Sequence, residues 1–92
     1  MSQRETKTLT LPKSGKEVEI YAWMTPREMF RIIKSENASE ETMKALIVRV
    51  DEEKSADKIV EILLDQIDVS DYKVLDDELT QLFPKQSGEK TT

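Results

Sequence analysis

The chain has 92 residues, lacks both cysteine and histidine, and carries 19 acidic against 14 basic side chains, for a net charge of −5. These absences exclude a disulfide framework and a thiolate nucleophile, and they remove the commonest general base and transition-metal ligand. The length suits a single domain, and no stretch approaches the roughly 20 apolar residues of a membrane span. We therefore expect a small cytoplasmic protein that is not an enzyme and uses no cofactor or metal.

Charge is distributed unevenly along the sequence. Residues 4–34 carry seven basic and four acidic side chains, whereas residues 35–83 carry five basic and fourteen acidic ones. An acidic body repels a phosphate backbone, so nucleic-acid binding is disfavoured. The runs Asp51–Glu53 and Asp76–Glu78 contain the right ligands for a hard cation, but adjacent helical side chains point in different directions, and neither run has calcium-loop spacing. We interpret both runs as solvated acidic faces.

Residues 7–23 predict a β-hairpin. Polar and apolar side chains alternate in Thr8–Leu11 and again in Glu17–Trp23, as expected of half-buried strands. Between them, Pro12 cannot donate to a sheet ladder, and Gly15 can adopt the positive φ that hairpin loops commonly need. The loop lacks the earlier glycine and the terminal Ser or Thr of a phosphate-binding loop, so we interpret it as a turn.

Four amphipathic helices are predicted to follow, at about residues 26–35, 39–50, 55–67 and 70–83. The first has the clearest start signal. Thr25 can cap it, Pro26 suits the first helical position, and Glu28 can complete a capping box. The remaining three each begin at a serine, which is a favourable capping residue: Ser39, Ser55 and Ser70.

The third predicted helix is the most apolar of the four. The second helix allows a strand as an alternative in its last residues. The stripe that predicts helix in 39–50 ends in Leu46, Ile47 and Val50, yet the run Leu46–Val48 would in isolation also suit a strand. The predicted class is thus α+β, with an N-terminal hairpin packed on a bundle of three or four short helices. Residues 7–83 form a single domain in this prediction, and residues 1–6 and 84–92 are expected to be disordered.

The outer face of the hairpin contains the candidate partner-binding residues. Strand alternation places Tyr21 and Trp23 opposite the apolar face that must cover the core. Aromatic side chains concentrate binding energy at protein interfaces, so we predict a contact site formed by Tyr21, Trp23, Met24 and Phe30. The alternative is that Trp23 folds back onto the first helix. No catalytic, cofactor-binding or metal-binding residue is predicted.

Two stretches resemble a known family. Leu11–Ile20 (LPKSGKEVEI), followed by the helix that Thr25 starts, resembles the N-terminus of tail assembly chaperones of long-tailed (siphovirus-like) bacteriophages and prophages. Their opening commonly reads Leu-Pro-Ser-Gly-Lys-x-Val-x-Ile, and here Lys13 is an additional residue. Ile67–Tyr72 (IDVSDY) is similar to the family's recurring start of the last helix, where a hydrophobic residue, an aspartate, an aromatic residue and leucines follow one another.

The resemblance implies a viral, cytoplasmic protein without catalytic residues. It would bind the tape measure protein, and possibly the tail tube protein, during tail assembly in the host, and would be absent from the mature virion. Weak homo-oligomerisation is compatible with this role. The competing class is a small acidic regulatory or adaptor protein, similar to an antitoxin or anti-repressor, that binds a basic protein partner. A DNA-binding regulator would need a basic recognition helix, whereas the later helices are acidic.

Overall fold

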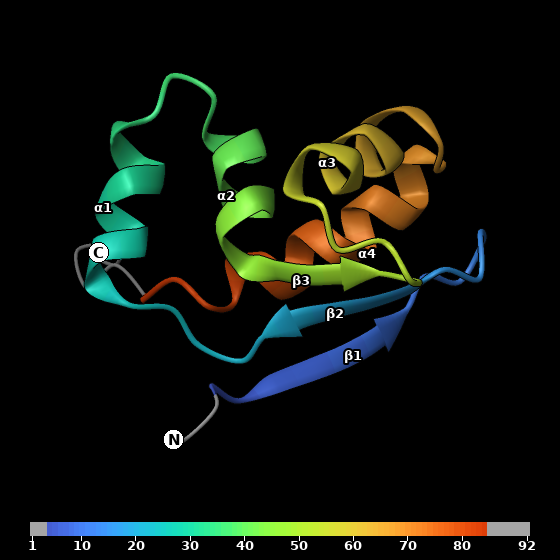
Figure 1. The fold of residues 1–92 in the computed structure, drawn as a ribbon, viewed down its shortest axis with the longest axis horizontal. Coiled ribbons are helices and arrows are strands. Elements are labelled where there is room, and N and C mark those ends of the chain that lie inside the picture. Colours follow the sequence, from blue (N-terminus) through green and yellow to red (C-terminus); the bar gives the residue numbers. More distant parts are fainter. Residues whose placement is uncertain (1–3, 85–92) are drawn as a thin grey trace, which may run out of the picture.

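The structure, a computed structural model, describes residues 4–84 and has the predicted α+β class (Figure 1). Its elements are, in chain order, β1 (Thr6–Thr10), β2 (Glu17–Tyr21), α1 (Pro26–Lys34), α2 (Ala38–Leu46), β3 (Ile47–Val50), α3 (Ala56–Asp65) and α4 (Val69–Thr80). The strands form one antiparallel sheet in the order β1-β2-β3. The predicted hairpin and the four predicted helices are all present, and the third strand is additional.

The hydrophobic core lies between one face of the sheet and the helices. Val18 and Ile20 of β2 are fully buried, whereas Glu17 and Glu19 face away from the core. Gly15 has the predicted positive φ, at 77°, in the loop that joins β1 to β2. The other buried apolar residues come from the hairpin end, all four helices and β3: Leu11, Ile32, Met43, Leu46, Ile47, Val50, Ile59, Val60, Leu63, Leu75 and Leu79.

The predicted capping box starts α1. The Glu28 backbone N–H donates to the Thr25 hydroxyl at 3.2 Å, and the Thr25 N–H donates to a Glu28 carboxylate oxygen at 3.0 Å. These two bonds satisfy donors that a helix start otherwise leaves free, so the hairpin passes into α1 at a defined residue. Pro26 occupies the first turn, where its missing N–H costs nothing.

The other helices start near the predicted serines, but not through them. At α4 the carboxylate of Asp68 is the cap and accepts the Ser70 N–H at 2.9 Å. Ser39 lies inside α2, whose N-cap is Asn37, and Ser55 occupies the N-cap of α3 without a side-chain capping bond. Aspartate and serine are similarly good caps, so the pattern alone does not choose between neighbouring ones.

The predicted helix over residues 39–50 is wrong in its last turn. α2 ends at Leu46, and Ile47–Val50 forms β3, which pairs antiparallel with β2. A helix would place Ile47 and Val50 on one face, whereas a regular strand would place them on opposite faces. β3 buries both because its register with β2 shifts between Glu19 and Ile20, so burial does not distinguish the two structures. Pairing decides: β2 gains a partner on its second edge, and Arg49 donates to the Glu19 carboxylate at 2.9 Å. The strand alternative for Leu46–Val48 is thus confirmed for Ile47 and Val48, whereas Leu46 is the last residue of α2.

The predicted disorder of residues 1–6 is wrong for residues 4–6. β1 begins at Thr6, and the Ala22 N–H donates to the carbonyl oxygen of Glu5 at 2.9 Å. Arg4 makes the contacts described below. Of the predicted disordered tail, only Pro84 is described; residues 1–3 and 85–92 lie outside the described part of the chain.

Across residues 4–84, no helix has the length and apolar character needed to cross a membrane.

Candidate functional site

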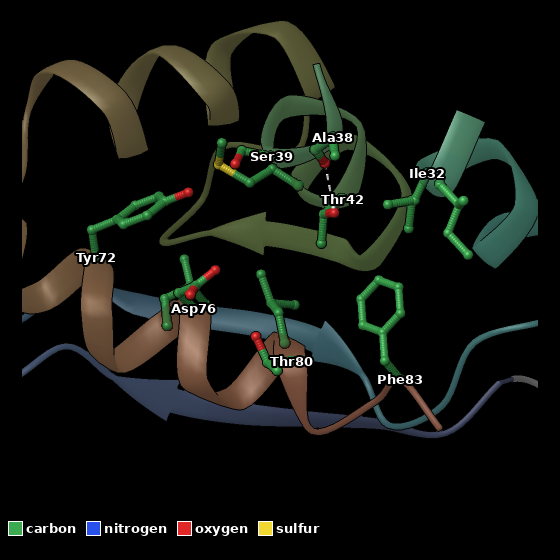
Figure 2. Close-up of a pocket in the computed structure, with 12 residues that line it drawn as sticks. Ile32, Ala38, Ser39, Thr42, Tyr72, Asp76, Thr80 and Phe83 are labelled. Atoms are coloured by element: carbon green, nitrogen blue, oxygen red, sulfur yellow. Dashed lines mark hydrogen bonds between the residues drawn. The ribbon is translucent and has the colours of Figure 1, made fainter. Parts of the chain in front are cut away.

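An apolar groove lies between α4 on one side and α1 and α2 on the other, and we call it the α4 groove (Figure 2). Its volume is about 280 Å³. The lining residues are Ile32, Ile33, Ala38, Ser39, Thr42, Met43, Tyr72, Leu75, Asp76, Leu79, Thr80 and Phe83. On α2 and α4 they recur at three- and four-residue spacing, so each of these two helices presents one continuous stripe to the groove, and α1 adds the adjacent residues Ile32 and Ile33.

The groove has an apolar floor and a partly polar rim. Four of its apolar residues belong to the buried core: Ile32, Met43, Leu75 and Leu79. In Figure 2 the rings of Tyr72 and Phe83 stand at opposite ends of the groove, with Asp76 and Thr80 between them on α4. Thr42 faces them from α2, and its hydroxyl donates to the carbonyl of Ala38 at 2.7 Å. An apolar centre with a polar rim is the usual anatomy of a protein-binding surface.

Asp76 gives the groove its charge. It is the only charged side chain that lines the groove, it is exposed, and it forms no ion pair within 4.0 Å in residues 4–84. Its two neighbours on α4 differ: Asp77 pairs with Lys73 at 3.0 Å, and Glu78 pairs with Lys7 at 2.8 Å. The groove therefore carries a negative charge that the described chain leaves uncompensated.

The predicted contact residues Tyr21 and Trp23 lie at a different place, which we call the Arg4 corner (Arg4, Tyr21, Trp23 and Glu28). The Arg4 guanidinium carbon lies 3.9 Å from the centroid of the Tyr21 ring and 4.8 Å from that of Trp23. Its nitrogens donate to both carboxylate oxygens of Glu28, at 2.6 and 2.8 Å, and to the Trp23 carbonyl at 2.7 Å. The chain's own cation thus occupies the space beside both aromatic rings.

The ion pair between Arg4 and Glu28 shifts the pKa values of both side chains. The hydrogen bond to Glu28 raises the pKa of Arg4, and the hydrogen bond from Arg4, together with that from the Thr25 backbone, lowers the pKa of Glu28. Both groups are therefore held in their charged forms. The corner joins the start of β1, the end of β2 and the first turn of α1, so its evident role is to fix these three segments.

The other two predicted contact residues are not part of the Arg4 corner. Met24 packs partly against the core and lines a separate shallow pocket with Pro26 and Met29. Phe30 lies on α1 with 53% of its surface exposed, and Trp23 is 48% exposed. The structure thus brings Tyr21 and Trp23 together around Arg4 but does not gather all four residues into one site. Whether they bind a partner stays a prediction.

Sequence reasoning missed the role of Asp71, which it placed only in a tight corner before the last helix. The Asp71 side chain is fully buried, and its carboxylate accepts the backbone N–H groups of Lys13 and Ser14 at 2.9 and 2.7 Å. Burial raises the pKa of Asp71, but these hydrogen bonds outweigh it and hold the pKa below its usual value. The sequence offered one signal for this contact. Asp71 lies in the stretch Ile67–Tyr72, and its partners lie in the polar loop of the stretch Leu11–Ile20, and both stretches carry the resemblance.

Within residues 4–84, no group of three or more acidic side chains is placed to hold a metal ion. The α4 groove is an apolar surface that is open to another molecule. Comparisons with protein-family models, with curated proteins and with solved structures find no match, so the likeness to tail assembly chaperones remains a resemblance of two sequence stretches.

Proposed function

We propose that this protein is a tail assembly chaperone of a long-tailed bacteriophage or prophage, which binds the tape measure protein and keeps it soluble during tail tube assembly. The observation that carries the proposal is the α4 groove, an open apolar surface on a chain in which 36% of the residues are charged. A tape measure protein, as a long helical chain, exposes apolar stripes until the tube forms around it. A small charged protein that covers such a stripe would oppose its aggregation.

The groove suits a macromolecular partner better than a small molecule. Its volume of about 280 Å³ lies at or below the low end of ligand pockets, roughly 300–1,000 Å³. In a ligand pocket, a few polar groups converge on the ligand and orient it. In this groove the polar groups are spread along the rim: one carboxylate, three hydroxyl-bearing side chains and the phenol of Tyr72. An extended apolar strip is typical of a site for a helix.

The two stretches that carry the resemblance form one structural unit, which also supports the proposal. Asp71, from the later stretch, accepts hydrogen bonds from Lys13 and Ser14 of the earlier one. These residues are 58 and 57 positions away in the sequence. A chain that keeps both stretches therefore keeps a specific contact between the hairpin loop and the start of α4, the helix that forms one wall of the groove.

Co-expression with the tape measure protein of the same phage or prophage tests the proposal. The two proteins should co-purify, and the soluble fraction of the tape measure protein should rise above that seen when it is expressed alone. An unrelated long helical protein of similar length serves as the control for nonspecific capture. Failure to co-purify, with unchanged solubility of the tape measure protein, would contradict the proposal. A complex that dissolves at modest salt would instead favour the acidic adaptor function.

A further inference from the structure

The structure points to a defined partner for the α4 groove. Resting on the proposed function, we infer that the groove binds one amphipathic helix of the partner protein. That helix presents apolar side chains at positions i, i+4 and i+7 to the groove floor and places a lysine or arginine beside Asp76.

The length of the groove matches such a helix. On α4 the lining residues run from Tyr72 to Thr80, a span of about 12 Å at 1.5 Å per residue. Positions i and i+7 of a bound helix lie about 10 Å apart along its axis. The rings of Tyr72 and Phe83 at the two ends of the groove (Figure 2) set the limits between which the three apolar side chains fit.

The floor of the groove is preformed. Met43, Leu75 and Leu79 are buried in the core and are held there whether or not the groove is filled. Binding therefore needs little ordering of the floor, which reduces the entropic cost of association. Ile33 rises at the α1 side with 63% of its surface exposed, so it is free to cover the flank of a bound helix.

The negative charge of Asp76 favours a partner helix with positive charge beside its apolar stripe. Among residues 4–84, Asp76 is the only charged group lining the groove, and residues 35–83 carry fourteen acidic against five basic side chains. A partner helix with carboxylates beside its apolar stripe would be repelled, whereas one with lysine or arginine there would be attracted and oriented.

Other occupants fit the groove less well. Residues 85–92 (KQSGEKTT) contain no large apolar side chain with which to fill it. An extended peptide gains affinity by adding to a free sheet edge, but helices form the walls of this groove, and their backbone groups are already bonded internally. A second copy of the chain is distinguished by experiment below.

The inference is tested with two synthetic helical peptides of about 18 residues, long enough for five turns. One carries leucine at i, i+4 and i+7 with flanking lysines, and the other has glutamates in place of those lysines. Binding to the full-length protein is followed by fluorescence anisotropy. The lysine peptide should bind, and Asp76→Lys should weaken it by about tenfold or more while strengthening the glutamate peptide. The matched control Asp77→Lys changes the net charge by the same amount on the same helix. It should alter the affinity for either peptide by no more than about twofold.

The apolar part of the surface has its own pair of variants. Ile33→Glu should weaken the lysine peptide by about tenfold or more, because it places a carboxylate against the bound apolar stripe. Val69→Glu, at an apolar residue that is 79% exposed and lies outside the groove, should leave binding unchanged. Circular dichroism and urea unfolding confirm that each variant is folded. Absence of lysine-peptide binding, or equal effects of the groove and control variants, would overturn the inference.

The same variants separate this inference from the proposed function. If the tape measure protein co-purifies equally well with Ile33→Glu and Asp76→Lys, the chaperone function stands and the groove inference is overturned. If the tape measure protein never co-purifies but the lysine peptide binds as described, the groove inference stands and the proposed function fails. Light scattering that shows a dimer abolished by Ile33→Glu would identify the occupant as a second copy and would also overturn the inference.

Discussion

The Arg4 corner and the α4 groove are both places where large apolar side chains reach the surface, but among residues 4–84 only the first is completed by the chain's own side chains. At the corner, Arg4 lies beside the rings of Tyr21 and Trp23 and is neutralised by Glu28. In the groove, by contrast, Asp76 has no described cation within ion-pair distance. An exposed aromatic pair in the sequence thus became a structural contact, while a helix face that resembled ordinary core was left open.

The difference has a physical cause. At the corner, one guanidinium makes cation–π contacts with two aromatic rings and charge-assisted hydrogen bonds with a carboxylate. All four groups therefore find their interaction partners within the corner. A polar side chain cannot cover the groove in the same way, because an apolar surface gains free energy only when another apolar surface removes it from water. Four predictions test this contrast, in order of decreasing expected effect.

Leu75→Ala tests whether the groove floor belongs to the fold. Leu75 is fully buried, so its truncation should cost about 2–5 kcal/mol of unfolding free energy through lost burial and cavity formation. Ile33→Ala at the exposed rim should cost no more than about 0.5 kcal/mol. Urea unfolding measures both. A loss below about 1 kcal/mol for Leu75→Ala would show that the floor is peripheral.

Asp71→Asn tests the contact that fixes α4 against the hairpin loop. Asparagine keeps the size but offers only one acceptor, so its NH₂ group would face one of the two N–H donors of Lys13 and Ser14. The buried, unsatisfied donor should lower the midpoint of thermal unfolding by on the order of 10 °C. The exposed aspartate variant Asp65→Asn is the control. Equal midpoints for the two variants would contradict the structural role of Asp71.

Arg4→Ala breaks the Arg4 corner. It removes the stacking on Tyr21 and Trp23 and the bonds to Glu28, and we expect a loss of about 1–2 kcal/mol in unfolding free energy. Arg31→Ala, at an exposed arginine on α1, is the matched control. The emission of the single tryptophan should also change in the Arg4 variant. If both arginine variants unfold alike, the corner contributes nothing measurable.

The acid limb of stability tests the ion pair at the corner. Glu28 has a pKa lowered chiefly by the hydrogen bond from Arg4, so its folded-state value lies below its unfolded one, about 4.3. Its contribution is therefore full above that pH and is lost as the pH falls through the folded-state value. Glu28→Gln should flatten the decrease in the urea midpoint below about pH 4.3, whereas Glu36→Gln in the exposed α1–α2 connection should not. Identical acid limbs would show that the pair is not formed.

Local sequence patterns predicted much of the fold because they act over a few residues. The capping box of Thr25 and Glu28 and the positive φ of Gly15 follow from hydrogen-bonding and steric rules that need no distant partner. An amphipathic last helix was likewise predicted, and Leu75 and Leu79 on its apolar face are buried. That this stripe also forms one wall of a groove was not predicted, since the opposite wall comes from other helices.

The sequence by itself determined the α+β class, the hairpin, the α1 start and the existence of four helices. The tertiary structure alone decided that Ile47–Val50 pairs as a strand, that Arg4 covers Tyr21 and Trp23, and that Asp71 binds the hairpin loop. Each of these contacts joins residues at least 17 positions apart. Periodicity and capping report the preferences of neighbouring residues, whereas a strand partner or a buried carboxylate depends on which distant donors the completed fold brings within reach.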